Sequence, residues 1–465
     1  MKSVINRLIE QQVSSDGVLC VGKKSCKDFV WISLLDKTYN TEDGHFEICW
    51  DDKSPHQAGC IYAEFHYETQ KGVDKYKHLF DNEQLDILEV FPWEKGFGCH
   101  LTNDCCVQIN GNLHQCIERS VKQLYKLYGF IKHRLKMEEY VQLLEENYNI
   151  ILHGAPGTGK TFLAWEIAEK LIVKKQGVSS LSEADKKDQV KFVQFHPSYD
   201  YTDFVEGLRP TKPDKNGIIG FNHKNGVFKD LCKTALDNDK KTFVFIIDEI
   251  NRGEISKIFG ELFFSIDPGY RGNERVVETQ YQNLIEDAEK EGFKDGFFVP
   301  KNVYLIGTMN DIDRSVESMD FAFRRRFTFV EITAKESQSI LDRVNAWGID
   351  TNGKSLKPDE SNLQKIKNRM DNLNNKIWYE AKDEENDDES GIEGLSSSYH
   401  IGAAYFLKIV KYIIQDTRGN IQYDFNNLWR FHLRGLLKEY LRGMEEANQK
   451  LIQLETAFND DKINQ

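Results

Sequence analysis

The sequence predicts an α/β core built on a parallel sheet, preceded by a separate α+β domain and followed by a helical subdomain. Three observations predict this class. From residue 148 an apolar run, a glycine-rich loop and a helical pattern follow one another. Two later apolar runs each end in polar side chains, as parallel strands do at a ligand-binding edge. Beyond Glu331 apolar residues recur at helical spacing. We expect domains at 1–130, 131–333 and 334–465.

Composition places the chain among water-soluble globular proteins. Its 465 residues are 40% hydrophobic and 29% charged. No apolar run approaches the roughly 18 residues of a membrane helix, and the N-terminus lacks the apolar segment of a signal peptide. We therefore expect a cytoplasmic protein with no membrane contact. The net charge of -13 argues against a broad nucleic-acid-coating surface, but a local basic groove or a ring pore stays open.

The N-terminal region has its own composition. Short runs rich in aromatic and β-branched residues, such as HFEICW and CIYAEFHYE, predict strands. An apolar stripe between Cys116 and Tyr128 predicts a helix that closes this α+β domain. Glu64 and Glu68 fit the solvated face of a strand better than a nuclease carboxylate pair. No CxxC pair supports a zinc site, although this region holds most of the cysteines: Cys20, Cys26, Cys49, Cys60, Cys99, Cys105, Cys106 and Cys116.

The stretch YNIILHGAPGTGKTFLAWEIAEKL (148–171) contains a complete GxxxxGKT loop between a strand and a helix. Glycines let backbone N–H groups turn inward around phosphate oxygens, and the following helix points its positive end at them. Lys160 would neutralise the β- and γ-phosphates, and the Thr161 hydroxyl would bind Mg²⁺. The expected nucleotide-binding residues are Gly154, Ala155, Pro156, Gly157, Thr158, Gly159, Lys160, Thr161 and Phe162, together with Asp248.

An acidic pair follows the second apolar run, Thr242 to Ile247. This run is apolar throughout, as in a strand that is buried on both faces. Asp248 and Glu249 then fall at the carboxyl end of a parallel strand, where open α/β sheets bind ligands. We expect Asp248 to help hold Mg²⁺ and Glu249 to orient and polarise the attacking water.

The third run, Val303–Ile306, leads into GTMNDIDRS (307–315). We expect this strand to lie between the P-loop strand and the Asp248 strand, with Asn310 pointing at the γ-phosphate. An amide at that place can hydrogen-bond the phosphate or the lytic water, which is the sensor role in AAA+ ATPases. Asp311 is expected to be a polar turn residue without a catalytic role. The run FAFRRRF (321–327) follows, and an arginine there can stabilise charge across a subunit interface.

Several separated stretches resemble the McrB family, the AAA+ motor subunit of modification-dependent restriction systems. MNDIDRS is similar to the family signature MNxxDRS, and the similar stretches recur in order over about residues 135–445. In IGAAYF (401–406), Ala403 stands where the family has a histidine. The other stretches are FVQFHPSYDYTDFVEGLRP (192–210), NGVFKDLC (225–232), FIIDEINRGEISKIFGEL (245–262) and FAFRRRF (321–327).

The resemblance implies an enzyme that hydrolyses GTP, with ATP as the alternative, and that uses Mg²⁺. It implies catalytic roles for Glu249 and Asn310, for Asp313 and Arg314 of the signature, and for Arg325 and Arg326 at a subunit interface. It further implies a homo-hexameric ring and a McrC-like PD-(D/E)xK endonuclease partner, in antiviral defence. The resemblance does not cover residues 1–130, which we expect to bind DNA with modified bases. A competing hypothesis is an AAA+ ATPase that remodels a protein partner. A scaffold with a degenerate site conflicts with the complete set of nucleotide motifs.

Two further segments carry expectations of structure. NGIIGFNHKNGVF (216–228) predicts a β-hairpin with its turn at Asn222 to Lys224. His196 and His223 could touch DNA, but isolated histidines more often have structural roles. Helices are expected after residue 331 in a lid that clamps the nucleotide, including YFLKIVKYIIQDT (405–417). The acidic run 382–390 is expected to be a solvated loop.

Overall fold

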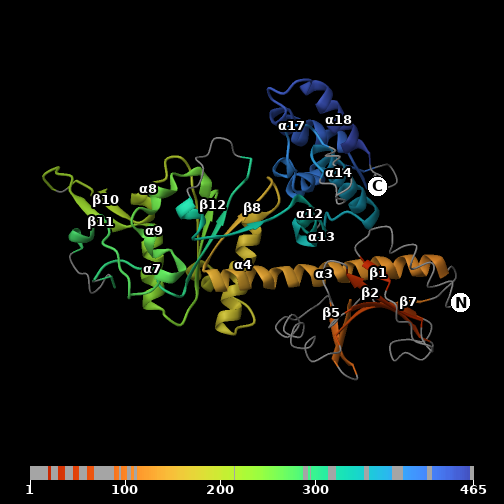
Figure 1. The fold of residues 1–465 in the computed structure, drawn as a ribbon, viewed down its shortest axis with the longest axis horizontal. Coiled ribbons are helices and arrows are strands. Elements are labelled where there is room, and N and C mark those ends of the chain that lie inside the picture. Colours follow the sequence, from red (N-terminus) through yellow and green to blue (C-terminus); the bar gives the residue numbers. More distant parts are fainter. Residues whose placement is uncertain are drawn as a thin grey trace. The chain divides into compact units, whose positions relative to one another are not determined.

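The computed structural model divides the chain into two compact units, Met1–Glu139 and Tyr140–Gln465 (Figure 1). The predicted boundary at residue 130 falls inside helix α3 (Leu113–Asn147), which runs unbroken through it. The structure describes residues 19–21, 30–36, 45–51, 60–67, 88–93, 96–101, 106–108, 113–213, 215–285, 292–293, 295–312, 321–349, 355–379, 391–415 and 421–460.

The first unit has the α+β character that the sequence predicts. Its sheet is antiparallel, in the order β1-β2-β3-β4-β6-β5, with β7 also paired to β4. The apolar stripe of α3 is buried, including Val121, Leu124 and Leu127. Glu64 lies in β4 opposite a residue of β3, whereas Glu68 lies outside the described residues. The strands are β1 (Leu19–Val21), β2 (Val30–Asp36), β3 (His45–Asp51), β4 (Cys60–Tyr67), β5 (Leu88–Trp93), β6 (Gly96–Leu101) and β7 (Cys106–Gln108).

The second unit contains a parallel sheet of order β14-β8-β13-β12-β9. The predicted position of β13 between the P-loop strand β8 and the acidic strand β12 is therefore confirmed. Because all five strands run the same way, their polar carboxyl ends meet at one edge. The strands are β8 (Asn149–His153), β9 (Val190–Gln194), β12 (Phe243–Asp248), β13 (Val303–Thr308) and β14 (Thr328–Glu331).

Helices cover this sheet and bury its apolar strands. Helix α4 (Lys160–Gln176) presents Ala164, Ile167 and Leu171 inward, and Gly177 ends it in the left-handed region. Phe245 of β12 packs in a fully buried aromatic cluster with Phe204, Phe228 and Phe259. The other helices of the core are α5 (Glu183–Gln189), α6 (Tyr201–Phe204), α7 (Val227–Asp237), η2 (Ile250–Arg252), α8 (Ile255–Phe259), α9 (Leu262–Ser265), η3 (Pro268–Tyr270), η4 (Gln282–Leu284) and α11 (Phe321–Arg324).

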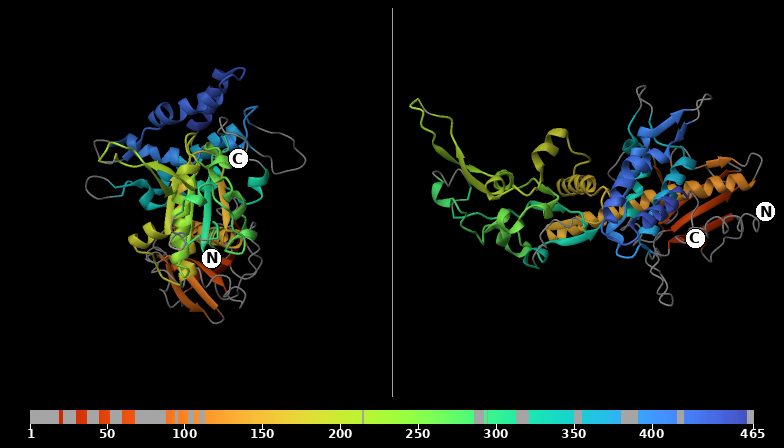
Figure 2. Two further views of the ribbon diagram at one scale, coloured as in Figure 1. Left: turned by 90° about the vertical axis from the view of Figure 1, so that its left-hand side faces the viewer. Right: turned by 90° about the horizontal axis from the view of Figure 1, so that it is seen from above.

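A β-hairpin is present, but the predicted turn is wrong. Strand β10 (Glu206–Pro210) pairs with β11 (Phe221–Asn225), so Asn222 to Lys224 lie inside a strand. The connection is residues 211–220, which contain a proline and the two glycines Gly217 and Gly220 and therefore supply the turn chemistry. Figure 2 shows this hairpin projecting away from the parallel sheet.

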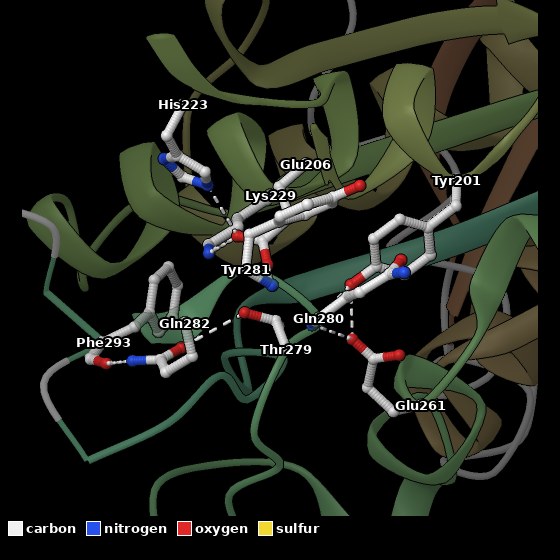
Figure 3. A network of polar contacts seen from close by, with 10 residues as sticks. All are labelled: Tyr201, Glu206, His223, Lys229, Glu261, Thr279, Gln280, Tyr281, Gln282 and Phe293. Carbon is white, nitrogen blue, oxygen red and sulfur yellow. Dashed lines mark hydrogen bonds and ion pairs between the residues drawn. The ribbon is translucent and has the colours of Figure 1, made fainter. Parts of the chain in front are cut away.

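A buried polar network anchors the base of the hairpin (Figure 3). Glu206 and Lys229 are both fully buried and form an ion pair. The Tyr281 backbone N–H donates to Glu206 at 2.8 Å, and His223 Nε2 lies 3.0 Å from the same carboxylate. Although burial opposes its ionisation, Lys229 holds the pKa of Glu206 below its ordinary value. His223 thus has a structural partner.

The C-terminal part of the second unit is mainly helical, with one departure from the prediction. Residues 405–417 do not form one helix, because β15 (Ile413–Gln415) pairs with β16 (Ile421–Tyr423). The β-branched pair at 413–414 favours a strand. The helices are α12 (Ala334–Ser337), α13 (Ser339–Asp342), η5 (Val344–Trp347), α14 (Glu360–Ile377), η6 (Ser397–Tyr399), α15 (Ala403–Phe406), η7 (Leu407–Tyr412), α16 (Phe425–Leu428), the π-helix η8 (Trp429–Leu433), α17 (Arg434–Tyr440) and α18 (Ala447–Asn459).

Two further expectations concern the acidic run and membrane contact. The acidic run 382–390 lies outside the described residues. Among the helices that the structure does describe, none combines the length and the apolarity needed to cross a membrane.

Candidate nucleotide-binding site

The glycine-rich loop leaves β8 and curls around the side chain of Lys160. Gly154, Gly157 and Gly159 have φ values of 138°, 77° and 81°, a region that suits glycine. The Lys160 ammonium donates to the carbonyls of Ala155 at 2.7 Å and Gly154 at 3.1 Å. It is buried at the start of α4. This is a concave loop with a lysine at its centre, which suits a chain of phosphate groups.

Two hydroxyl groups converge on Asp248 at the end of β12. The Thr161 hydroxyl donates to Asp248 Oδ1 at 2.6 Å, and the Thr308 hydroxyl donates to the same oxygen at 2.6 Å. The structure thus brings together the two predicted metal-binding residues. Their oxygen atoms suit Mg²⁺, which prefers oxygen ligands and retains waters and substrate phosphates. Sequence reasoning missed Thr308, whose position at the end of the neighbouring strand was the available signal.

Glu249 adopts a backbone conformation that is rare for a residue with a side chain. Its φ of 51° and ψ of 46° lie in the left-handed region, at a cost of about 1–3 kcal/mol. Its carboxylate accepts a hydrogen bond from Asn310 Nδ2 at 2.8 Å. Arg252 Nε donates to the other carboxylate oxygen at 3.1 Å. The Glu249 N–H lies 3.3 Å from the Thr308 hydroxyl. The two predicted catalytic residues Glu249 and Asn310 are therefore hydrogen-bonded to each other. The contact of Arg252 with Glu249 was not predicted from the sequence.

Asp311 lies in a turn, as expected, and its side chain also has a partner that the sequence did not indicate. His153 Nδ1 lies 3.1 and 3.2 Å from the two Asp311 carboxylate oxygens. The Asp311 backbone N–H also donates to the carbonyl of Gly154 at 3.3 Å. These contacts join the loop after β13 to the P-loop strand, which sequence spacing could not reveal. Asp313 and Arg314 lie outside the described residues.

The adjacent arginines after α11 have different surroundings. Arg325 is exposed. Arg326 is only 7% exposed, and its guanidinium lies 4.6 Å from the centre of the Phe263 ring and 3.9 Å from Asp267. Its backbone carbonyl accepts a hydrogen bond from Asn149 at 2.8 Å. Arg326 thus packs within its own core, whereas Arg325 lies at the surface.

Known proteins match the region that contains this geometry. The model of the AAA domain (dynein-related subfamily) matches residues 149–327. The type IV methyl-directed restriction enzyme EcoKMcrB subunit of Escherichia coli (strain K12) is 34% identical over 76% of this chain and 65% of its own length. By these matches the chain resembles the McrB family of AAA+ proteins. The type II restriction enzyme BsuMI component YdiS of Bacillus subtilis (strain 168) is 27% identical over 42% of this chain and 60% of that protein. The chain thus spans somewhat less than two thirds of each relative.

The lid contacts the P-loop through its main chain. The Gly402 N–H donates to the Pro156 carbonyl at 2.9 Å, and the Ala404 N–H donates to the Gly157 carbonyl at 3.0 Å. A Cβ on Gly402 would lie 2.2 Å from the Gly157 carbonyl carbon, so only glycine allows this approach. Ala403, which stands where the family stretch has a histidine, is fully buried.

A second lid contact involves the helix that follows the P-loop. Arg343 makes a bidentate ion pair with Glu166 of α4, at 2.6 and 3.1 Å. The same guanidinium lies 5.1 Å from the centre of the Phe162 ring. Phe162, one of the predicted nucleotide-binding residues, is half-exposed at the first turn of α4. The lid is therefore joined to both the loop and the helix that would surround a nucleotide.

Proposed function

We propose that this protein is the nucleotide-hydrolysing motor subunit of a modification-dependent restriction system. The observation that carries the hydrolytic activity is the arrangement of Asp248, Glu249 and Asn310 beside a glycine-rich loop that surrounds Lys160, and the similarity to the EcoKMcrB subunit supports the restriction role. These groups supply phosphate binding, metal binding, water orientation and a neutral hydrogen-bond donor, which together meet the needs of phosphoryl transfer to water.

In this proposal each side chain has a separate task. Lys160 and the loop N–H groups bind the β- and γ-phosphates, and Thr161 and Asp248 hold Mg²⁺, which neutralises charge on the phosphates. Glu249 orients the attacking water and accepts its proton. Asn310 lies within hydrogen-bond distance of Glu249 and supports both that carboxylate and the charge that develops at the γ-phosphate.

The mutation Glu249→Gln tests the catalytic assignment. We expect the variant to bind nucleotide and assemble as the wild type does, because Mg²⁺ and P-loop contacts remain. It should lose hydrolysis, because the amide cannot take the proton. Turnover equal to wild type would overturn the role of Glu249.

We further propose GTP as the preferred nucleotide, on the family resemblance. Steady-state hydrolysis of GTP and ATP at equal concentration decides between them. Faster turnover of ATP would remove the GTPase assignment and leave the motor assignment intact.

For assembly we propose a homo-hexameric ring in which Arg325 reaches the nucleotide of the neighbouring subunit. Its exposure supports this role. The partner would be a McrC-like PD-(D/E)xK endonuclease, and the relative in Escherichia coli is itself named as a subunit of a restriction enzyme. Mass measurement with and without nucleotide tests the ring.

The first unit would bind DNA with modified bases. The support is the name of the EcoKMcrB subunit, methyl-directed, which belongs to a relative that is 34% identical over 76% of the chain. The full chain should bind a methylated duplex more tightly than the same duplex without methylation. Equal binding of both duplexes, or of neither, would instead favour a motor that remodels a protein partner.

A further inference from the structure

The short loop Asn310–Ile312 contacts three different parts of the second unit with three successive side chains. Asn310 donates to the carboxylate of Glu249. Asp311 pairs with His153 at the end of the P-loop strand. Ile312 packs against the apolar cluster of the lid. Of these residues, sequence reasoning gave a role only to Asn310.

The backbone of this loop continues the pairing of β13 with β8 beyond the end of the sheet. The Met309 N–H donates to the Leu152 carbonyl at 3.0 Å, and the Asp311 N–H donates to the Gly154 carbonyl at 3.3 Å. The second of these bonds is long, so the backbone alone holds the loop weakly at residue 311. The side-chain pair of His153 and Asp311 adds a restraint at that point.

The surroundings of the pair favour a fixed geometry. The side chains of His153 and Asp311 are 24% and 19% exposed, so water screens them only in part. The His153 ring packs edge-on against Phe329 of β14, with the ring centres 5.8 Å apart. The imidazole is thus held on one side by an aromatic ring and on the other by a carboxylate, and it can donate Nδ1–H in its neutral form.

We propose that His153 and Asp311 are positioning residues for nucleotide hydrolysis. Their hydrogen bond fixes the loop so that the amide of the next residue back, Asn310, stays 2.8 Å from Glu249. Loss of the bond lets the loop move while the P-loop keeps its own contacts. The proposal rests on the proposed hydrolytic function, because hydrolysis is its readout.

The test uses two pairs of variants in the full-length protein. Asp311→Ala and His153→Phe remove the hydrogen bond, and the phenylalanine retains a ring against β14. Asp311→Asn retains an oxygen acceptor, and His153→Asn retains a donor near the position of Nδ1. A misplacement of about 1 Å costs up to about 100-fold in rate. We expect a fall in kcat of about 10- to 100-fold in the first pair and a smaller fall in the second.

Nucleotide affinity separates positioning from loss of structure. The dissociation constant of a non-hydrolysable nucleotide analogue should stay within about twofold of wild type in all four variants, because the P-loop contacts remain. The double variant Asp311→Ala/His153→Phe should be no slower than the worse single variant, since both changes break one bond. Additive losses in kcat, or parallel losses of affinity and thermal stability, would overturn the proposal.

Two controls complete the experiment. Glu145→Ala removes a partly exposed carboxylate that pairs with Lys174 and Lys175 away from the loop, and its kcat should equal wild type. Glu249→Gln separates a failure of the positioning proposal from a failure of the proposed hydrolytic function. If it abolishes hydrolysis while Asp311→Ala and His153→Phe hydrolyse as wild type does, the positioning proposal fails and the proposed function stands. Undiminished hydrolysis in Glu249→Gln would count against the proposed function instead.

Discussion

Replacement of Asn310 by alanine removes the amide that contacts the catalytic carboxylate. In the structure Asn310 Nδ2 donates to Glu249 Oε1 at 2.8 Å, a charge-assisted bond of ordinary length. Such a bond contributes about 1.5–3 kcal/mol. If the amide also stabilises charge in the transition state, its loss lowers the rate by about 10²–10³-fold. The loss of about 10²–10³-fold in rate applies only if the contact between Asn310 and its partner strengthens in the transition state. The change in kcat therefore tests directly whether Asn310 acts in the transition state.

Affinity for the nucleotide should change little in Asn310→Ala. The phosphate-binding loop and Lys160 hold their geometry through contacts that do not include Asn310. Steady-state kinetics should therefore give a reduced kcat, and titration of a non-hydrolysable analogue should give a dissociation constant within about twofold of wild type.

A matched control removes the same kind of hydrogen bond, from an asparagine amide to a carboxylate, at a position away from the nucleotide site. The Asn362 amide in the lid also donates to a carboxylate, that of Asp359, at 3.1 Å. Asn362→Ala should hydrolyse nucleotide as wild type does, apart from a small loss of stability. If Asn310→Ala matches this control, or raises KM at unchanged kcat, Asn310 has no role in the transition state.

Three other outcomes are expected. Arg325→Ala should lose hydrolysis without loss of thermal stability, whereas Arg326→Ala should lower the melting temperature because it removes a buried guanidinium from its aromatic partner. If Arg325→Ala lowers the melting temperature and Arg326→Ala loses hydrolysis instead, Arg325 is not the residue that acts across the interface. Gly402→Ala should weaken nucleotide binding by about tenfold or more, measured by titration, because its Cβ would meet the P-loop backbone at 2.2 Å and move the lid. Lys229→Met should lower the free energy of unfolding by about 3–5 kcal/mol, since it removes the buried ammonium that pairs with the buried Glu206 carboxylate. In wild type the pKa of Glu206 is lower in the folded than in the unfolded chain, so its contribution to the free energy of unfolding is complete above the ordinary pKa of 4.5 and is lost as pH falls. Urea titrations between pH 3 and 7 should show this decrease in the free energy of unfolding in wild type and not in Lys229→Met.

Much of the second unit follows from local sequence. Apolar runs such as Thr242 to Ile247 are typical of buried strands, and GxxxxGKT between a strand and a helix is typical of a phosphate-binding loop. The polar residues at the three strand ends indicated only a shared edge, and the separate expectation that β13 lies between β8 and β12 agrees with the strand order. The hairpin was less predictable. Residues Asn222 to Lys224 were expected to form the turn, but they pair with β10, and the connection between the strands is residues 211–220.

The tertiary structure alone decided how the side chains of the site meet. Nothing local to Asp311 indicates His153, since the two are 158 positions apart and meet only because β13 lies beside β8. The left-handed conformation of Glu249 and the burial that separates Arg326 from Arg325 likewise depend on neighbours that are distant in sequence. The sequence by itself determined strands β8, β12 and β13, the phosphate loop and the acidic pair, because these depend on short-range hydrophobicity and backbone preference. Contacts between loops depend on the sheet order that packing selects, and so only the folded chain defines them.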